Sequence, residues 1–421
     1  MKKDIAVIIL AAGKSTRMKS EMPKVMHPLC CRPMLGYVLD TVASLKPKQV
    51  VCVLGHKQEL VRKAIPDGIK IVIQKKLVGT ADAVKTGLSA LKGFKGTVLI
   101  LYGDTPLLKN ETIKKLLDYH ITNNVDATLL TAQVKKPAGY GRIVRNKLFS
   151  ITGIVEEKEA DEVQKEIKEI NTGIIVFKKE ALKENLKFIK ANNRKKEFYL
   201  TDIIEILAKK GKLVDAIKAE DAPEALGINT RMELAQANSL MQKRINDSFM
   251  SNGVTIVDPA STFIAYGTKI GADTVIYPFT VVERNVKIGK RCFIGPFAHL
   301  RENVELSDEV TAGNFFEMVR AKIGPKTFVK HFSYIGDTKV GANVNIGAGT
   351  VTANFDGKNK HDTAINNNVN IGSDTIIVAP VKIGANSATG AGSVVTKDIP
   401  ANTIVCGVPA RFLKKKILKK G

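Results

Sequence analysis

The chain has 421 residues, which is too long for one ordinary hydrophobic core and predicts two or more domains. Hydrophobic residues make up 44% and charged residues 25%, a composition typical of globular proteins rather than of disordered or membrane-embedded ones. The net charge of +24 is compatible with binding to nucleic acid or a membrane surface, but the lysines are spread along the chain and there is no tryptophan to stack on bases. We therefore interpret most of this charge as solvated surface that favours anionic substrates.

The cysteines and the N-terminal apolar run bear on the cellular compartment. The five cysteines are odd in number and have no CxxC spacing, which predicts reduced thiols and a cytoplasmic location; they are Cys30, Cys31, Cys52, Cys292 and Cys406. The run Ile5–Ala12 follows two lysines as in a signal peptide, but it is short and leads into Gly13 and Lys14. It predicts a buried strand, and no other stretch predicts insertion into a membrane.

Residues 1 to about 225 alternate strand-like and helix-like segments. Strands are predicted at Ile5–Leu10, Val50–Leu54, Ile69–Ile73, Thr97–Tyr102, Ala127–Val134 and Gly173–Phe177. Amphipathic helices are predicted at Gly36–Leu45, Ala81–Leu91 and Asn110–Ile121. This alternation predicts an α/β domain in which helices cover both faces of a mostly parallel sheet, with ligands bound at the carboxyl ends of the strands.

A small-residue turn follows the first predicted strand. It begins at Leu10-Ala11-Ala12-Gly13, and Arg17 and Lys24 come soon after it. Backbone N–H groups of such a turn can approach phosphate oxygens, and the two cations would offset the charge of a polyphosphate. The Walker spacing GxxxxGK[ST] is missing. The turn alone predicts phosphate binding, with an ordinary strand-to-helix turn as the alternative.

The second part of the chain is joined to the first by a predicted helix and carries an internal repeat. The helix covers Arg231 to Met250, with Leu234, Asn238, Met241, Ile245 and Phe249 on one stripe and Gly253 as its stop. After it, aliphatic or small residues recur every six positions, with two slips and one interruption: Ile270, Ile276, Val282, Ile288, Ile294, Leu300, Leu306, Ala312, Met318, Ile323, Val329, Ile335, Val340, Ile346, Ile365, Ile371, Ile377, Ile383, Thr389 and Val395. A hexapeptide period predicts a parallel β-helix. The interruption from Thr352 to Ala364 predicts a loop outside the coil, and such loops often carry function.

Many short stretches, in order, match one family. In the first half they are Leu10–Met18, Met22–His27, Gln74 with Gly79-Thr80-Ala81, Tyr102–Leu107, Gly139–Ile143, Gly153–Glu156, Glu169–Gly173 and Gly227–Asn229. In the second half they are Leu300-Arg301, Gly313–Met318, His331–Asp337, Asn345–Thr350, Ala353–Lys360 and Gly372-Ser373. Over nearly its whole length the chain resembles the bifunctional bacterial enzymes that join N-acetylglucosamine-1-phosphate uridylyltransferase to glucosamine-1-phosphate N-acetyltransferase.

The resemblance implies a fold and a division of the chain. Residues 1–228 would form a Rossmann-like uridylyltransferase domain, and residues 229–252 a linker helix. Residues 253–421 would form a left-handed parallel β-helix that carries the acetyltransferase.

In this family the sugar phosphate attacks the α-phosphate of UTP and expels pyrophosphate with the help of Mg²⁺. The resemblance implies that the nucleotide is held by the backbone of Leu10, Ala11, Ala12 and Gly13 and by Gln74, Gly79, Thr80, Tyr102 and Gly103. Arg17 and Lys24 would act in catalysis by compensating the triphosphate charge. Gly141, Glu156 and Asn171 would contact the sugar. Ser15 stands where the family usually has a second glycine.

Asp104 and Asn229 are implied as the metal ligands. Oxygen ligands of this kind suit Mg²⁺, which keeps other positions for water and phosphate. The alternatives are that Asp104 caps a turn after its strand and that Asn229 caps the helix that begins at Arg231.

The acetyltransferase residues are implied in the same way. His331 would be the general base that takes a proton from the attacking amine, a task suited to histidine at neutral pH, with an ordinary surface histidine as the alternative. Arg301, Tyr334 and Asn345 would bind the sugar phosphate. Acetyl-CoA would contact Ala348, Asn354, Phe355, Ser373 and Ala391.

Three positions depart from the family pattern in this half. Val319 stands where a lysine is expected, and the neighbouring Arg320 is a candidate to substitute for that lysine. Phe355 replaces a tyrosine, and Gly407–Arg411 replaces an arginine-containing segment. These departures leave open a monofunctional nucleotidyltransferase whose β-helix is only a trimerising or regulatory platform. The presence of His331 and Asn345 favours the bifunctional enzyme, a homotrimer with UTP, glucosamine 1-phosphate, N-acetylglucosamine 1-phosphate and acetyl-CoA as ligands and with no nucleic-acid partner.

Overall fold

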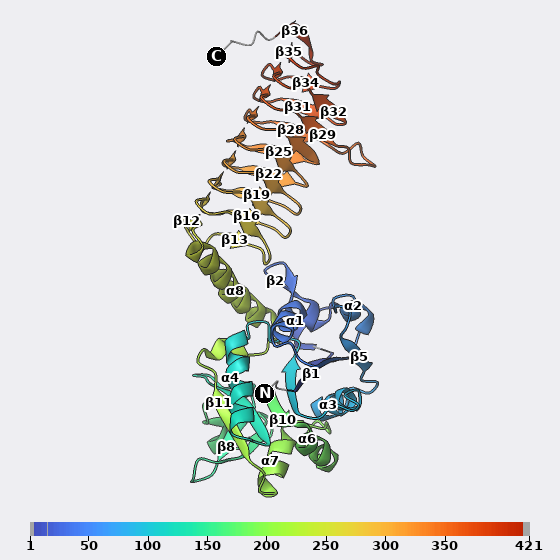
Figure 1. Ribbon diagram of the computed structural model, residues 1–421, viewed down its shortest axis with the longest axis vertical. Coiled ribbons are helices and arrows are strands. Elements are labelled where there is room, and N and C mark those ends of the chain that lie inside the picture. Colours follow the sequence, from blue (N-terminus) through green and yellow to red (C-terminus); the bar gives the residue numbers. More distant parts are fainter. Residues whose placement is uncertain (1–3, 15, 416–421) are drawn as a thin grey trace. The chain divides into compact units, whose positions relative to one another are not determined.

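The computed structural model describes residues 4–14 and 16–415, and the chain divides into two compact units, Met1–Ala237 and Asn238–Gly421 (Figure 1). The boundary falls within helix α8 (Arg231–Ser251), whose predicted existence and bounds are confirmed to within one residue. None of the helices in the described part of the chain is long and apolar enough to span a membrane.

The first unit contains a nine-stranded sheet. Its main path runs β11 (Val214–Lys218), β7 (Ala127–Gln133), β10 (Glu169–Lys178), β6 (Thr97–Tyr102), β1 (Ile5–Ala11), β4 (Gln49–Leu54) and β5 (Lys70–Ile73). All pairs on this path are parallel except those of β10, which is antiparallel to both β6 and β7. The predicted mostly parallel sheet is therefore confirmed, with β10 beginning earlier than predicted.

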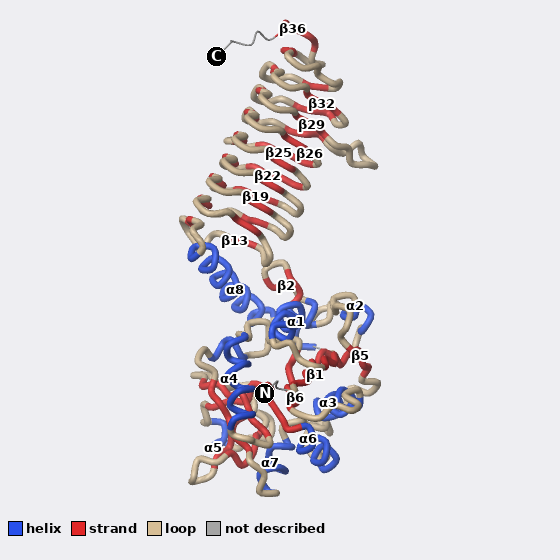
Figure 2. Tube along the Cα trace, in the orientation of Figure 1, coloured by secondary structure: helices blue, strands red, loops and turns tan. Residues whose placement is uncertain are grey.

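Helices cover both faces of this sheet because alternate strand residues point to opposite sides. Ile8 in β1 packs in one buried cluster with α3 (Thr80–Ser89) and α7 (Asp202–Lys209). Its neighbour Ile9 packs in the other cluster with α1 (Met34–Ser44) and α4 (Asn110–Thr122). The central strands are buried on both faces, which explains their continuous apolar runs. Figure 2 separates these helices from the strands by colour.

Shorter elements escaped the sequence analysis. They include strands β2 (Pro28–Leu29), β3 (Arg32–Pro33), β8 (Arg142–Arg145), β9 (Ile151–Val155) and β11, and helices α2 (Gln58–Arg62), α5 (Glu162–Lys165), α6 (Lys179–Asn185) and α7. Short 3₁₀ turns η1 (Thr16–Met18), η2 (Lys24–Met26), η3 (Leu186–Phe188) and η4 (Ala222–Ala225) complete the unit. The β8–β9 hairpin matters most, because it joins the main sheet through β10 and carries part of the site described below.

The second unit is a parallel β-helix of three sheets. The first sheet stacks β12 (Thr255–Ile256), β15 (Val275–Ile276), β18 (Phe293–Ile294), β21 (Thr311–Ala312), β24 (Phe328–Val329), β27 (Asn345–Ile346), β30 (Asn370–Ile371), β33 (Ala388–Thr389) and β35 (Thr403–Cys406), with β36 (Arg411–Lys415) antiparallel at its end. The second stacks β13 (Phe263–Ile264), β16 (Val281–Val282), β19 (Ala298–Leu300), β22 (Phe316–Val319), β25 (Ser333–Gly336), β28 (Val351–Ala353), β31 (Ile376–Val378) and β34 (Val394–Val395). The third stacks β14 (Lys269–Ile270), β17 (Lys287–Ile288), β20 (Glu305–Leu306), β23 (Lys322–Ile323), β26 (Thr338–Val340), β29 (Thr363–Ile365) and β32 (Val381–Ile383).

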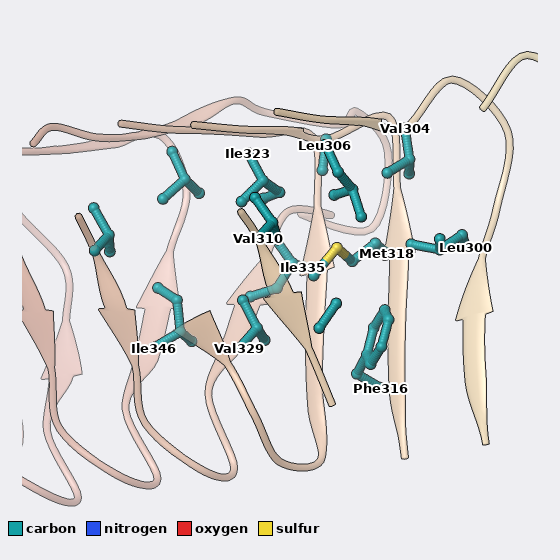
Figure 3. Packing of buried hydrophobic residues seen from close by; sticks show 14 of the residues in the cluster. Leu300, Val304, Leu306, Val310, Phe316, Met318, Ile323, Val329, Ile335 and Ile346 are labelled. Atoms are coloured by element: carbon teal, nitrogen blue, oxygen red, sulfur yellow. The ribbon is translucent and has the colours of Figure 1, made fainter. Parts of the chain in front are cut away.

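The six-residue period marks the inward positions of this coil. Leu300, Leu306, Met318 and Ile346 lie in one continuous buried cluster (Figure 3), as do the other aliphatic residues of the period except Ile270, which is partly buried against it. Thr389 is buried as a polar member of the series. The predicted β-helix core is therefore confirmed position by position.

The corners of the coil have a repeat that the sequence analysis did not detect. Residues three positions after the inward ones, such as Asn285, Asn303 and Phe315, adopt left-handed φ values of 60°, 62° and 55°. Asparagine tolerates this conformation better than most residues, whereas phenylalanine does not. Phe279, Phe297 and Phe315 occupy successive corners, and their rings stack with centroids 4.9 Å apart in each pair.

The predicted loop is present between β28 and β29, which it connects from Asn354 to Asp362. Asp356 holds its tip: its carboxylate accepts hydrogen bonds from the N–H groups of Lys358 and Asn359 at 2.8 and 2.6 Å. The coil is unaffected, because Ile346 and Ile371 on either side of the loop are paired in register.

Candidate functional site

Four residues predicted for the triphosphate and the metal are connected by direct contacts through Lys24 and Asn229. The Lys24 ammonium forms an ion pair with the Asp104 carboxylate and donates to Asn229 Oδ1 at 2.8 Å. Arg17 donates to the same Asn229 oxygen at 2.9 Å. Asp104 is 9% exposed. Residues from three distant parts of the chain therefore form one charged cluster at the carboxyl ends of β1 and β6, where the sequence analysis placed the ligand.

Neither Asn229 nor Asp104 has the capping role that was the alternative. Helix α8 is capped by Thr230 and Glu233: Thr230 Oγ1 accepts from the Glu233 N–H at 3.2 Å, and the Glu233 carboxylate accepts from the Thr230 N–H at 2.9 Å. This capping box leaves the Asn229 side chain directed at the two cations. In the turn after β6 it is the Thr105 hydroxyl that donates to the Tyr102 carbonyl, at 2.9 Å.

The predicted phosphate-binding turn lies beside this cluster. The Leu10 carbonyl accepts from the Gly103 N–H at 3.0 Å, so the two turns after β1 and β6 adjoin. A Cβ at Gly13 would meet no atom within 4 Å, which leaves the backbone of the turn accessible to a ligand. Ser15, the departure from the family, lies outside the described residues.

A second group of predicted nucleotide-binding residues lies near the start of α3. It consists of Gln74, Gly79 and Thr80 and is called the nucleotide wall below. Gln74 Nε2 donates to the Gly79 carbonyl at 3.0 Å. Thr80 Oγ1 accepts from the Leu200 N–H at 2.9 Å and hydrogen-bonds the Tyr102 hydroxyl. Tyr102 thus joins the nucleotide-side residues to the end of β6, and burial, with Glu156 and Asp104 nearby, raises the pKa of its hydroxyl well above its ordinary value.

The three predicted sugar residues lie side by side across three strands. In the antiparallel register Arg142 pairs with Val155 on β9 and with Ile170 on β10, so Gly141 lies opposite both Glu156 and Asn171. The Asn171 N–H donates to the Gly141 carbonyl at 2.8 Å. A Cβ on Gly141 would lie 3.0 Å from Ile154 and 3.5 Å from the Glu156 carboxylate, so glycine keeps this position narrow.

Glu156 belongs to a group of acidic residues, with Asp202 and Glu205, that the sequence analysis did not find. Its Oε1 accepts from the Thr201 hydroxyl at 3.0 Å, and burial raises the pKa of its carboxyl. Burial, with Glu156 and Glu205 nearby, raises the pKa of Asp202 to about 6. Thr201 and Asp202 begin α7, an element with no distinctive motif, so only the fold brings them to the sugar residues.

The second candidate site lies along one corner of the β-helix. His331, Ala348, Ser373 and Ala391 each follow an inward residue of the first sheet by two positions, and their coils stack in register. The Phe332 carbonyl accepts from the Gly349 N–H at 2.7 Å and the Ala348 carbonyl from the Asp374 N–H at 2.6 Å. His331 is exposed, and among the described residues no side chain hydrogen-bonds its ring. A histidine with a free ring is available to a substrate.

The sugar-phosphate residues of this half do not all meet within one chain. Arg301 and Tyr334 flank Glu317 on the second sheet, where Arg301 donates to Glu317 Oε1 at 2.8 Å. Asn345 lies on the first sheet and donates to Asn370 Oδ1 at 2.9 Å. Sheet geometry therefore separates Asn345 from Tyr334 across the corner that holds His331.

Asn354 is the first residue of the loop, and its side chain is hydrogen-bonded to the Asp337 carboxylate. Its Nδ2 donates to Asp337 Oδ2 at 2.5 Å, and Arg320 donates to both oxygens of the same carboxylate at 2.5 and 2.7 Å. Arg320 is therefore committed to Asp337, which argues against its suggested role as a substitute for the missing lysine. Val319 is buried, whereas Phe355 is 58% exposed on the loop.

The remaining departures lie at the end of the coil. Within the Gly407–Arg411 segment Arg411 is exposed and donates to the Ala410 carbonyl at 3.1 Å. The lysines from 416 onward, part of the basic tail, lie outside the described residues.

The donor set fits Mg²⁺ better than a transition metal. No group of three or more His, Cys, Asp and Glu side chains suited to a metal occurs in the described ranges. Asp104 and Asn229 instead offer two oxygens that both contact the Lys24 ammonium and so lie close together. Two hard oxygen ligands leave positions for water and phosphate, as Mg²⁺ requires.

Family models match both units. A model described as a MobA-like NTP transferase domain matches residues 7–169. Two models of hexapeptide repeats match the coil: bacterial transferase hexapeptide (six repeats) over 267–302, and the hexapeptide repeat of succinyl-transferase over 363–397.

Curated relatives match almost the entire chain. Proteins named "Bifunctional protein GlmU" are 44% identical in Thermosipho africanus, covering 95% of this chain and 94% of the relative, and 40% identical in Shouchella clausii, covering 98% of each. The protein of that name in Geobacillus sp. is 42% identical and covers 94% of each. These matches extend through both units rather than one. The chain belongs to the family of bifunctional GlmU proteins.

Proposed function

We propose that this protein makes UDP-N-acetylglucosamine in two steps: acetyl transfer from acetyl-CoA to glucosamine 1-phosphate, then uridylyl transfer from UTP to N-acetylglucosamine 1-phosphate. The full-length family relationship makes it a nucleotidyltransferase and an acyltransferase. The observation that supports the residue assignments is the cluster in which Lys24, Arg17, Asp104 and Asn229 meet. We assign residues 1–228 to uridylyl transfer, 253–421 to acetyl transfer, and 229–252 to the linker.

In uridylyl transfer the chain positions the reactants and compensates charge. The turn from Leu10 to Gly13 and the wall of Gln74, Gly79 and Thr80 bind the nucleotide. Gly141, Glu156 and Asn171 orient the sugar so that its phosphate oxygen attacks the α-phosphorus of UTP, the bond to the β-phosphate oxygen breaks and pyrophosphate leaves. No protein nucleophile is needed, since positioning and charge stabilisation supply most of the catalysis in phosphoryl transfer.

Lys24 exchanges partners in this scheme. In the free protein its ammonium compensates Asp104 and contacts Asn229. When the triphosphate binds, Lys24 and Arg17 would turn to phosphate oxygens, and Asp104 and Asn229 would be the residues that hold Mg²⁺. The ion, when bound, neutralises developing charge on the phosphates.

In acetyl transfer His331 accepts a proton from the amine of glucosamine 1-phosphate. The amine nitrogen forms a bond to the thioester carbonyl carbon, the carbon–sulfur bond breaks, and CoA leaves as the thiolate. Arg301, Tyr334 and Asn345 bind the sugar phosphate. The corner residues Ala348, Ser373 and Ala391, with Asn354 and Phe355, bind acetyl-CoA.

We further propose a homotrimer in the cytoplasm. A trimer is supported by the separation of Asn345 from Tyr334, because a second copy can supply what one chain holds apart. The cytoplasm is supported by the odd number of cysteines and by the absence of a CxxC spacing in the sequence. Light scattering on the active protein measures the mass, and an active monomer would contradict the shared site.

The deciding experiment follows both products in one reaction. The pure protein is incubated with glucosamine 1-phosphate, acetyl-CoA, UTP and Mg²⁺, and CoA and pyrophosphate are measured separately. Release of both, with pyrophosphate dependent on acetyl-CoA, supports the bifunctional enzyme. Pyrophosphate release only from ready-made N-acetylglucosamine 1-phosphate would instead support the monofunctional alternative.

A further inference from the structure

Arg142 is a buried cation next to the sugar residues that none of the steps above uses. Its side chain is among the largest fully buried ones, at 1% exposure for the residue. A charge so deeply buried destabilises the fold unless its partners compensate it. Its partners therefore indicate what its position achieves.

These partners belong to the segments that carry Gly141 and Glu156. Arg142 donates through Nη1 to the Tyr140 carbonyl and through Nη2 to Glu157 Oε2 at 2.7 Å. A longer bond of 3.4 Å reaches the Lys165 carbonyl. The Glu157 carboxylate in turn accepts a hydrogen bond from the Gly139 N–H. The Arg142–Glu157 pair is therefore bonded to the loop 139–141 at two points, the Gly139 N–H and the Tyr140 carbonyl.

Two backbone hydrogen bonds also hold this loop: the Tyr140 N–H donates to the Pro137 carbonyl at 3.2 Å, and the Gly141 carbonyl accepts from the Asn171 N–H at 2.8 Å. Neither of these bonds involves Gly139. Gly139 adopts a φ of +88°, and a Cβ there would meet no atom within 4 Å. Gly141 is the third residue of the loop, so two of its three residues are glycines, which lose the most backbone entropy when they are ordered. The Arg142–Glu157 pair adds contacts at Gly139 and Tyr140, which help to keep Gly141 opposite Glu156 and Asn171 before the sugar arrives.

The same strand supplies a comparison. Arg145, also on β8, makes a two-pronged ion pair with Glu169, at 2.9 and 2.8 Å, and donates to the Phe149 carbonyl. Its bonds reach β10 and the hairpin turn but not the 139–141 loop. Arg145 has the chemistry of Arg142, but its ion pair reaches Glu169, two residues before Asn171, and not the segments that carry Gly141 and Glu156.

We propose that Arg142, through its ion pair with Glu157, is a positioning residue that preorganises Gly141 and Glu156 for the sugar of the uridylyl acceptor. The inference rests on the proposed function. It predicts that Arg142 determines the KM for N-acetylglucosamine 1-phosphate and leaves the KM for UTP unaffected, since the nucleotide wall of Gln74, Gly79 and Thr80 has no bond to it.

The test compares Arg142→Met with Arg145→Met. Each substitution removes one guanidinium from β8 and keeps an unbranched side chain. For Arg142→Met we expect the KM for N-acetylglucosamine 1-phosphate to rise by about 10- to 100-fold, the effect of losing one or two charged hydrogen bonds. The KM for UTP and the rate of CoA release should stay within about twofold of wild type. Arg145→Met should leave both KM values unchanged even if it lowers the melting temperature.

Chemical rescue separates positioning from stability. In Arg142→Ala, millimolar guanidinium should restore the sugar KM, and methylammonium should not, because only a planar fork can reach both the Tyr140 carbonyl and Glu157. If Arg142 variants do not fold, Glu157→Gln is measured against the same criteria: the amide oxygen still accepts from Gly139, and the loss of charge should raise the sugar KM by about tenfold.

The outcomes are distinct. An unchanged sugar KM in Arg142→Met or Glu157→Gln, equal increases for sugar and UTP, or equal effects in both arginine variants would overturn the inference. Failure of the wild-type protein to use N-acetylglucosamine 1-phosphate at all would overturn the proposed function instead.

Discussion

Replacing Gly79 with alanine tests the nucleotide wall most directly. Gly79 precedes α3 with φ 127° and ψ 172°, a region that only glycine adopts readily. A Cβ there would lie 2.4 Å from the carbonyl oxygen of Phe198 and 2.6 Å from its nitrogen. Both atoms belong to the backbone, so the Phe198 segment has to move.

That segment is tied to the start of α3 by hydrogen bonds. The Phe198 N–H donates to the Val78 carbonyl at 2.8 Å, and its carbonyl accepts from the Ala81 N–H at 2.9 Å. The strained conformation costs about 1–3 kcal/mol and the two bonds about 1 kcal/mol each. We therefore expect a loss of about 3–5 kcal/mol in the first unit, or about 10 °C in its melting temperature. The KM for UTP should rise because Thr80, which accepts a hydrogen bond from the Leu200 N–H, is displaced with the Phe198 segment.

The matched control is Gly93→Ala. Gly93 also has a left-handed φ, 71°, but its Cβ would meet nothing within 4 Å, so only the conformational cost of about 1–2 kcal/mol applies. Differential scanning calorimetry and pyrophosphate release measure the two effects, and CoA release from the same preparation monitors the second unit. Equal melting shifts in the two variants, or an unchanged KM for UTP in Gly79→Ala, would refute the steric reasoning.

Three further predictions concern the chemistry. His331→Ala should lower CoA release by about 10²- to 10⁴-fold and leave pyrophosphate release from N-acetylglucosamine 1-phosphate unchanged. Asp104→Ala should lower pyrophosphate release and leave CoA release unchanged. Loss of both activities in either variant would contradict two separate sites. Chelation of divalent cations should abolish pyrophosphate release and spare CoA release, and an equal loss of both would remove Mg²⁺ from the scheme. Burial, with Glu156 and Glu205 nearby, raises the pKa of Asp202 to about 6, so its ionised form destabilises the fold above that pH. This destabilisation disappears when the pH falls below the pKa that Asp202 has in the unfolded chain, because the carboxyl is then protonated in both states. Asp202→Asn should therefore raise the melting temperature at about pH 8 but not at about pH 4, and equal shifts at both would refute this linkage.

The sequence was sufficient where a physical constraint repeats along it. Every sixth residue must enter a narrow core, so positions such as Leu306 and Ile371 could be predicted without the structure, and both are buried. The apolar runs of β1 and β6 were equally clear because both faces of these strands are covered. Short strands such as β8 have too few residues for an alternating hydrophobic pattern to be recognised, and β8 was missed.

Pairings between distant side chains could not be predicted from local pattern. Lys24 and Asp104 were both assigned to the same reaction, but their direct ion pair depends on the packing of two turns that are far apart in the chain. The commitment of Arg320 to Asp337 likewise depends on which residues the coil stacks, and it corrects the suggested phosphate role. Thr201 lies near Glu156 only because α7 packs under β9.

The loop from Asn354 to Asp362 leaves the coil and rejoins it without changing the pairing of Ile346 with Ile371. The pairing of the coils therefore continues past this loop without interruption. Under the proposed assignment of Asn354 and Phe355 to acetyl-CoA, a change of donor preference can be confined to this short segment, while the stacking of the coils stays the same. On that proposal, exchange of this loop is the substitution by which a new acyl-donor preference would be introduced without altering the core of the coil.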